Sequence, residues 1–147
     1  MHSEDQIIKQ ALSILAARIT IDGAILSSSD MVKKYLVLKL AALEHEVFAV
    51  LWLNNQNTLI AYEELFRGTL AEASVYPREI AKSALHYNAG AAILVHNHPS
   101  KIAEPSQADK NITKNLQSVL GLFDTRLLDH IIVGGLNTFS FAEHNLM

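Results

Sequence analysis

The sequence predicts a mixed α/β domain in which helices cover a mixed β-sheet. Apolar residues recur at every third or fourth position in several segments, as they do in amphipathic helices. Short apolar runs lie between these segments and are typical of buried strands, among them VFAVLWL and AGAAILV. Clusters of Asn, Gly, Ser and Pro separate the two kinds of segment. Together these observations predict the element order α α β β α β α β β.

Composition limits the class of protein. The chain has 147 residues, of which 50% are hydrophobic and 18% are charged, so it can bury a sizeable core. The net charge of −3 disfavours a strongly basic nucleic-acid footprint. Because the chain contains no cysteine, disulfides and thiolate-bound metals are excluded.

Two further features bear on location. The apolar runs are far shorter than the roughly 20 residues that a membrane span needs. The first residues, MHSEDQ, are acidic and polar, unlike the basic start of a secretory signal. We therefore expect a soluble, cytoplasmic protein that does not associate with a membrane.

The spacing of apolar residues in the first third of the sequence predicts two helices. Residues 4–19 have helical spacing, and Ser3 is a suitable N-cap. A loop over residues 20–29 follows and contains Asp22-Gly23. The second helix should run from about residue 29 to 44, with one apolar face formed by Met31, Tyr35, Leu38 and Ala42.

The middle of the chain predicts a hairpin. Residues 46–53 form a strand buried on both faces, Asn-rich residues 54–57 turn the chain, and residues 58–66 return as a second strand. Gly68 then breaks the pattern and is a candidate for positive φ.

The remaining elements alternate between helix and strand. Pro77 stands in the first turn of a helix that ends near residue 87, with Ile80, Ala84 and Leu85 facing inward. The later elements are a strand over 91–96, a helix over 106–120 that stops at Gly121, and strands over 126–133 and 138–141.

One segment places metal-ligand residue types at a strand-to-helix junction. His96 and His98 are two apart at the end of a strand, so their side chains share a face and Asn97 points the other way. Pro99 favours the end of the strand. Asp109 follows on the first turn of a helix. Two imidazoles and one carboxylate suit a catalytic zinc with a fourth position for water.

Plainer explanations exist for each of these residues. A His-x-His pair is more often surface or core histidine than a ligand pair. Ser106 and Asp109 also fit a capping box, with Ser106 as N-cap and the acid at N3. The two interpretations are compatible, since a first-turn carboxylate can cap the helix and still face a metal.

Hydrolysis by a metal-held water also needs a base for the water proton. Glu44 and Glu46 stand where the second helix gives way to the first strand. Glu46 is the better candidate because it directly begins the buried strand, which would fix its position. Either residue could instead be a solvated acid. Ser106 could cap its helix or help to orient the water and hold an oxyanion.

The other histidines offer weaker signals. His130 lies beside Asp129 at the start of an apolar strand and is expected to be structural. We expect surface positions for His2, His45, His86 and His144.

The candidate site residues resemble a known motif. Glu46, His96-x-His98 and Ser106-x-x-Asp109 have the spacing of the JAMM (JAB/MPN+) zinc metalloprotease motif. The flanking words FRGTL, YPRE, HNHPS and LLDHIIVG resemble the bacterial RadC-like branch, whose members are often named as DNA repair proteins.

This resemblance implies a fold and a reaction. The fold would be the cytidine-deaminase-like JAB/MPN fold, a curved mixed β-sheet flanked by helices, with one zinc per chain. His96, His98 and Asp109 would be the ligands. Glu46 would hold and deprotonate the water in the fourth position, and Ser106 would assist. The activity would be hydrolysis of a peptide or isopeptide bond in a peptide or protein substrate.

The resemblance covers roughly residues 30–147, which we expect to form the JAB/MPN domain after an N-terminal helical segment over residues 1–29. One departure stands beside the predicted ligands, because Lys101 occupies a position at which the family usually has Gly. Longer members also resemble this chain with an added N-terminal helix-hairpin-helix module, which we expect this chain to be too short to hold.

Two alternatives from other classes remain open. One is a DNA-repair-associated or nucleic-acid-binding protein, although the acidic balance and the expected lack of a DNA-binding module oppose it. The other is a catalytically inactive binding domain on the same fold, which the intact ligand set opposes. The sequence does not indicate a particular substrate or an oligomeric state.

Overall fold

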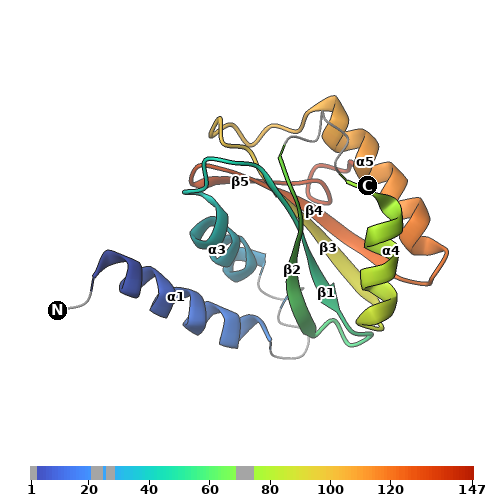
Figure 1. Cartoon of the computed structure of the whole chain (residues 1–147), viewed down its shortest axis with the longest axis horizontal. Coiled ribbons are helices and arrows are strands. Elements are labelled where there is room, and N and C mark those ends of the chain that lie inside the picture. The colour runs from blue at the N-terminus through green and yellow to red at the C-terminus, as the bar shows by residue number, and fades with distance from the viewer. Residues whose placement is uncertain (1–2, 21–24, 26–28, 69–74) are drawn as a thin grey trace.

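A five-stranded mixed sheet lies at the centre of the computed structural model, which describes residues 3–20, 25, 29–68 and 75–147 (Figure 1). The strands are ordered β2-β1-β3-β4-β5. Only β3 and β4 pair in parallel, and the other three pairs are antiparallel. Their bounds are β1 Val47–Leu53, β2 Leu59–Arg67, β3 Ala91–Asn97, β4 Arg126–Gly134 and β5 Asn137–Ser140.

Helices cover both faces of this sheet. In the described part of the chain the helices include α1 Glu4–Ile19, α3 Ser29–Leu40, α4 Pro77–His86 and α5 Gln107–Gly121. Residues of α1 and α3 pack on one face, and residues of α4 and α5 pack on the other (Figure 1). The mixed α/β architecture and the order of its elements are therefore confirmed.

The two central strands explain why the apolar runs are continuous. Every residue of β1 and β3 is buried, because helices cover the sheet on both sides. In β1, Val47, Ala49 and Leu51 face the α1 and α3 layer. Phe48 and Trp52 face α4 and α5 instead. His96 continues the second of these faces at the end of β3, next to Phe48 in the register.

Local signals set several boundaries where the sequence predicted them. Ser3 caps α1 through a capping box, in which its side chain accepts from the Gln6 amide at 3.2 Å. Pro77 begins α4, where a missing amide hydrogen costs nothing. Gly68 has a φ of 106°, so the predicted positive φ is confirmed.

The second helix differs from the prediction in its end and its buried face. It stops at Leu40 instead of continuing to about residue 44, because the chain must turn and extend to enter β1 at Val47. Leu38 is 37% exposed, although it was predicted to lie on the apolar face. The buried residues of α3 are Val32, Tyr35, Leu36 and Leu40.

The sequence also predicted one residue too many on the inward face of α4. Ile80 and Ala84 are four apart and pack on the sheet. Leu85 is the next residue, turned by about 100° around the helix, and is 60% exposed.

Some expectations fall outside the described residues, namely Asp22-Gly23 in the predicted loop and His2. The boundary expected between residues 29 and 30 stays a prediction. None of the described helices is long and apolar enough to cross a membrane.

Candidate metal centre

The end of β3 presents two imidazoles on one side. The strand ends at Asn97, and Pro99 follows two residues later. The rings of His96 and His98 lie on the same side, with centroids 5.0 Å apart. Asn97 points to the opposite side, where its amide contacts backbone near the start of β1. Strand alternation therefore gives the arrangement that the sequence predicted.

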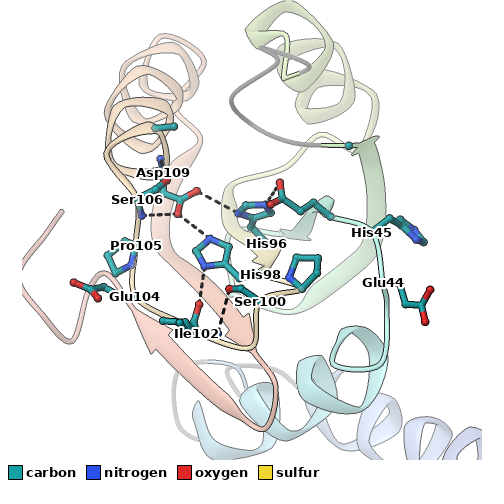
Figure 2. A pocket seen from close by; sticks show the side chains of 14 residues that line it. Glu44, His45, His96, His98, Ser100, Ile102, Glu104, Pro105, Ser106 and Asp109 are labelled. Atoms are coloured by element: carbon teal, nitrogen blue, oxygen red, sulfur yellow. Dashed lines mark hydrogen bonds and ion pairs between the residues drawn. The ribbon is translucent and has the colours of Figure 1, made fainter.

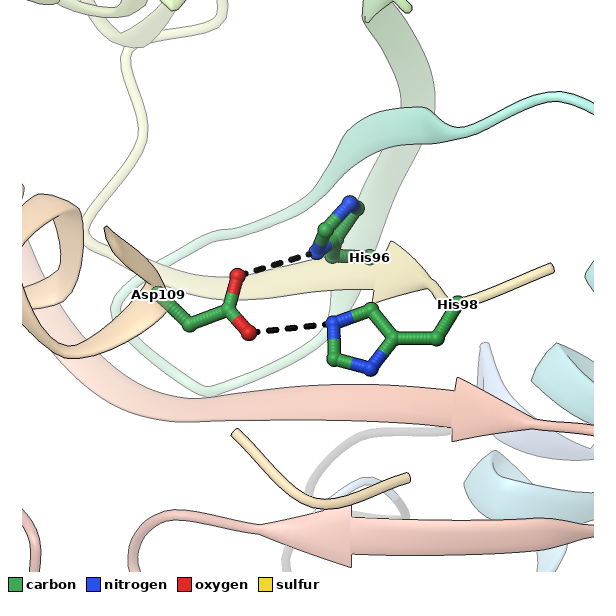
Figure 3. A group of neighbouring side chains, drawn as sticks. All are labelled: His96, His98 and Asp109. Atoms are coloured by element: carbon green, nitrogen blue, oxygen red, sulfur yellow. Dashed lines mark hydrogen bonds and ion pairs between the residues drawn. The ribbon is translucent and has the colours of Figure 1, made fainter. Parts of the chain in front are cut away.

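The start of α5 brings a carboxylate to these rings. Ser106 is the N-cap, its side chain accepts from the Asp109 amide at 3.1 Å, and its own amide donates to Asp109 Oδ2 at 2.8 Å. The capping box turns the carboxylate toward β3. Asp109 Oδ1 then lies 3.2 Å from His96 Nδ1, and Oδ2 lies 3.0 Å from His98 Nε2 (Figure 3). One ligand atom from each of the three residues falls within 4.8 Å of the others.

Buried polar atoms that make no hydrogen bond concentrate in this cluster. Among the described residues, they are both ring nitrogens of His96, Oδ1 of Asp109 and Nε2 of His130. Three of these four atoms belong to the predicted ligands. Unpaired buried polar atoms cost free energy, and a cation between them would satisfy several at once. The residues present therefore fit a metal ion.

The ring orientation of His98 supports the same conclusion. Its Nδ1 lies 2.8 Å from the carbonyl oxygen of Ile102, which can only accept, so Nδ1 carries the hydrogen. In the neutral ring, Nε2 then offers a lone pair toward Asp109 Oδ2, which is also an acceptor. Only a proton or a metal ion between the two atoms makes this contact favourable. A histidine whose second nitrogen donates to a backbone carbonyl is typical of metal ligands.

The ionisation of the cluster follows from these contacts. The hydrogen bond with Asp109 raises the pKa of His98, although burial opposes this shift. Burial alone would raise the pKa of Asp109. The nearby rings of His96 and His98 and the hydrogen bond from the Ser106 amide together outweigh burial and hold that pKa well below its usual range. The carboxylate is thus ionised and ready to bind a cation.

A pocket of about 860 Å³ opens over the cluster and is lined by all three residues (Figure 2). Glu46 and Ser106 also line it. Glu46 Oε2 lies 3.4 Å from His96 Nε2. Glu44 lines the same pocket but is exposed and extends away from the imidazoles (Figure 2). The geometry therefore distinguishes the two acids that the sequence offered.

Behind Asp109 lies a pair that the sequence did not assign to the site. The Thr113 hydroxyl donates to the Asp109 carbonyl at 2.6 Å and lies 2.6 Å from His130 Nδ1, which must therefore donate to it. Burial lowers the pKa of His130 to about 3, so this ring is neutral. Thr113 lies four residues, about one helical turn, after Asp109, and this spacing is the feature of the sequence that could have indicated the contact. Asn97 was also missed, because its partners His45 and Val47 are about 50 residues away in the sequence.

The other described histidines, His45, His86 and His144, do not belong to the cluster. His45 and His86 are exposed, as expected. His144 is exposed too, and its ring stacks on Phe139.

Comparisons with known proteins give one family. The sequence profile of the RadC-like JAB domain matches residues 26–146. The chain is 51% identical to the UPF0758 protein YkfG of Escherichia coli (strain K12) over 142 residues, which cover 97% of this chain and 90% of that protein. Identity to the UPF0758 protein YeeS of the same organism is 49% over 144 residues, or 98% and 97% of the two chains.

A third relative is longer. The UPF0758 protein Mpe_A2695 of Methylibium petroleiphilum (strain ATCC BAA-1232 / LMG 22953 / PM1) is 52% identical over 141 residues, which cover 96% of this chain and 63% of that protein. The names of these relatives state no activity, so the argument for a reaction depends on the geometry of the cluster.

Proposed function

The chain belongs to the RadC-like JAB domain family, and on that premise we propose that it is a zinc-dependent metallopeptidase-like hydrolase that cleaves peptide or isopeptide bonds. One observation carries the proposal. Two imidazoles and a buried carboxylate, with several unpaired polar atoms, converge at the base of an open pocket beside Glu46.

The donor set favours zinc as the cation. Nitrogen and carboxylate ligands in a group of three, with room for one more, are typical of catalytic zinc sites. His96, His98 and Asp109 would hold the ion. When bound, zinc supplies Lewis-acid chemistry, which makes water a stronger acid and polarises a substrate carbonyl.

Glu46 is the group best placed to move protons. It lines the pocket, and its carboxylate lies 3.4 Å from the ring of His96, so it is next to the atoms that face the substrate. In the proposed reaction Glu46 takes a proton from the attacking water. It then gives that proton to the leaving amine, which lets the carbon–nitrogen bond break.

Ser106 can stabilise charge on the substrate. Its oxygen accepts from the Asp109 amide, and this bond leaves the hydroxyl hydrogen free to point elsewhere. Because Ser106 lines the pocket, that hydrogen can donate to the carbonyl oxygen as negative charge develops there.

The charge of the pocket favours a peptide over a nucleic acid as substrate. Among the described residues that line it, four are acidic and none is Lys or Arg. The acids are Glu44, Glu46, Glu104 and Asp109. A phosphodiester backbone would be repelled here, since nucleic-acid sites usually carry basic side chains.

The proposal is tested with purified protein, a zinc assay and libraries of peptides and isopeptide-linked peptides. We expect stoichiometric zinc and measurable turnover. Glu46→Gln should keep its zinc but lose roughly 10²- to 10⁴-fold in kcat/KM, because general-base catalysis is lost. Glu44→Gln is the matched control and should stay near the wild-type rate. Zinc-loaded protein that cleaves no member of either library would contradict the proposal.

A further inference from the structure

A buried side-chain amide lies on the face of the sheet opposite the candidate site. In the sequence, its residue stands between two of the predicted ligands. Asn97 is the last residue of β3 and is 2% exposed. Its side chain points to the face of the sheet that carries α1 and α3, opposite His96 and His98. The neighbours on that face are apolar, including Val47 and Val95. A polar group in such a place needs specific partners.

The oxygen and the nitrogen of the Asn97 side-chain amide both form hydrogen bonds with one short stretch of backbone. Its Oδ1 accepts from the Val47 amide at 2.7 Å, and its Nδ2 donates to the His45 carbonyl at 3.0 Å. These two partners flank Glu46 on either side. The side chain therefore holds the backbone immediately before and immediately after the proposed base.

The β1–β3 ladder does not connect this stretch to the strand that carries the imidazoles. The pairing of β1 with β3 has its last pair at Phe48 and His96, and Glu46 precedes the first residue of β1. The Asn97 side chain continues the connection between the two segments where backbone pairing ends. The same stretch is tied to β2 as well, since Val47 pairs with Arg67 and the Gly68 amide donates to the Glu46 carbonyl at 3.0 Å.

We propose that Asn97 is a positioning residue that fixes Glu46 relative to the imidazoles. This inference rests on the proposed function, in which Glu46 moves the proton. Asparagine suits the role because one planar group supplies a donor and an acceptor at its end. Leucine has a similar shape and supplies neither. Displacing a catalytic group by about 1 Å can cost roughly 100-fold in rate.

The kinetic test uses Asn97→Leu, alone and combined with Glu46→Gln. Alone, we expect kcat to fall by roughly 10- to 100-fold, with KM within about twofold. Zinc affinity should not change, because no predicted ligand is altered. In the Glu46→Gln background, Asn97→Leu should have no further effect on kcat, because it acts through that carboxylate. An equal loss in both backgrounds would overturn the inference.

Thr125→Val is the matched control. Thr125 is 3% exposed and donates one buried hydrogen bond to the Ala89 carbonyl, away from Glu46. This variant should lose stability without losing kcat. If Asn97→Leu fails to fold, Asn97→Ser shortens the side chain so that it no longer reaches both partners, and it is measured in the same way.

Amide hydrogen exchange separates this inference from the proposed function. The Val47 amide should exchange faster in Asn97→Leu than in wild type, and not in Thr125→Val. This readout needs neither zinc nor activity. A wild-type protein without peptidase activity would contradict the proposed function, while unchanged exchange at Val47 would contradict the role of Asn97.

Discussion

Lys101 has a φ of 69° in the loop that follows His98. The other non-glycine residues with positive φ in the described chain are Asn or Asp, namely Asn57, Asn88, Asp124 and Asn145. Those side chains tolerate the left-handed region because they can bond nearby backbone. Lysine has no such compensation, so the strain is about 1 kcal/mol. The position matters because the resemblance to the RadC-like family led us to expect Gly here, and Gly adopts this region without strain.

We therefore predict that Lys101→Gly is at least as stable as wild type. Relief of strain is partly offset by the greater freedom of glycine in the unfolded chain, so the free energy of unfolding should rise by about 0–1 kcal/mol. Lys101→Ala keeps the strain and should show no gain. Urea unfolding measures both variants, and a loss of more than about 1 kcal/mol in Lys101→Gly would contradict the explanation.

The buried ring of His130 should make the stability of the protein depend on pH. Its native pKa is about 3, whereas an unfolded histidine has a pKa of about 6.5. Between these values the unfolded chain binds a proton that the native chain does not. The stabilising contribution is therefore complete above about pH 6.5 and is lost as the pH falls toward 3, by up to about 1.4 kcal/mol per pH unit.

Comparison of wild type with His130→Gln isolates this effect, since glutamine retains a hydrogen-bonding group for Thr113. Urea unfolding at several pH values from 7.5 to 4.5 should show a steeper fall in wild type. Parallel curves for the two proteins would mean that His130 is not buried in its neutral form.

At the scale of elements, the end of β4 sets the course of the loop between β3 and α5. A Cβ added to Gly134 would lie 2.5 Å from the Ala103 amide nitrogen and 2.6 Å from the Ile102 carbonyl carbon. Both are backbone atoms, which cannot move cheaply. The Ile102 carbonyl also accepts from the His98 ring. The absence of a side chain at Gly134 thus allows the loop to hold His98 in place.

Gly134→Ala should therefore weaken zinc binding by roughly 10- to 100-fold, as loss of a ligand's hydrogen-bonded support usually does. Gly121→Ala is the control, because a Cβ there meets nothing within 4 Å. That variant should bind zinc normally and be about 0.5–1 kcal/mol more stable. Competition with a chromophoric chelator measures both affinities, and equal values would refute the role of Gly134.

The elements could be predicted from the sequence where local signals dominate. Ser3, Pro77 and Gly68 act on the backbone within a few residues of themselves, so the boundaries near them were predicted well. The end of α3 was not, because residues 41–44, Ala-Ala-Leu-Glu, favour helix and contain no stop signal. Only the need to enter β1 ends that helix, and this requirement belongs to the tertiary fold.

The same distinction applies to the candidate site. His96, His98 and Asp109 lie within one short segment, so strand alternation and a capping box were enough to predict that they meet. Glu46 was selected by resemblance and by its place before a buried strand. The supporting contacts of Asn97 and Thr113 depend on the packing of separate elements, and periodicity carries no information about those.

At the scale of the whole molecule, the proposed zinc binding would be coupled to folding. If the folded cluster holds zinc, the ion at about 100-fold above its dissociation constant should stabilise the protein by roughly 2.7 kcal/mol. The shift in Tm should shrink as the pH falls below the raised pKa of His98, since zinc then competes with a proton. Thermal unfolding with zinc and with a chelator measures this effect, and Asp109→Asn should show little of it. A shift of equal size at pH 5 and pH 8 would argue that zinc binds elsewhere.

The central sheet separates the pocket from the layer formed by α1 and α3, and the Asn97 side chain meets its partners on the face of the sheet that this layer covers. With Asn97 in the proposed role, the rate of the proposed reaction would depend on positions that no bound substrate contacts. Laboratory evolution that randomises only the lining of the pocket would not sample them. Substitutions on the face of the sheet covered by α1 and α3, by contrast, could change the catalytic rate among homologues whose pocket residues are identical.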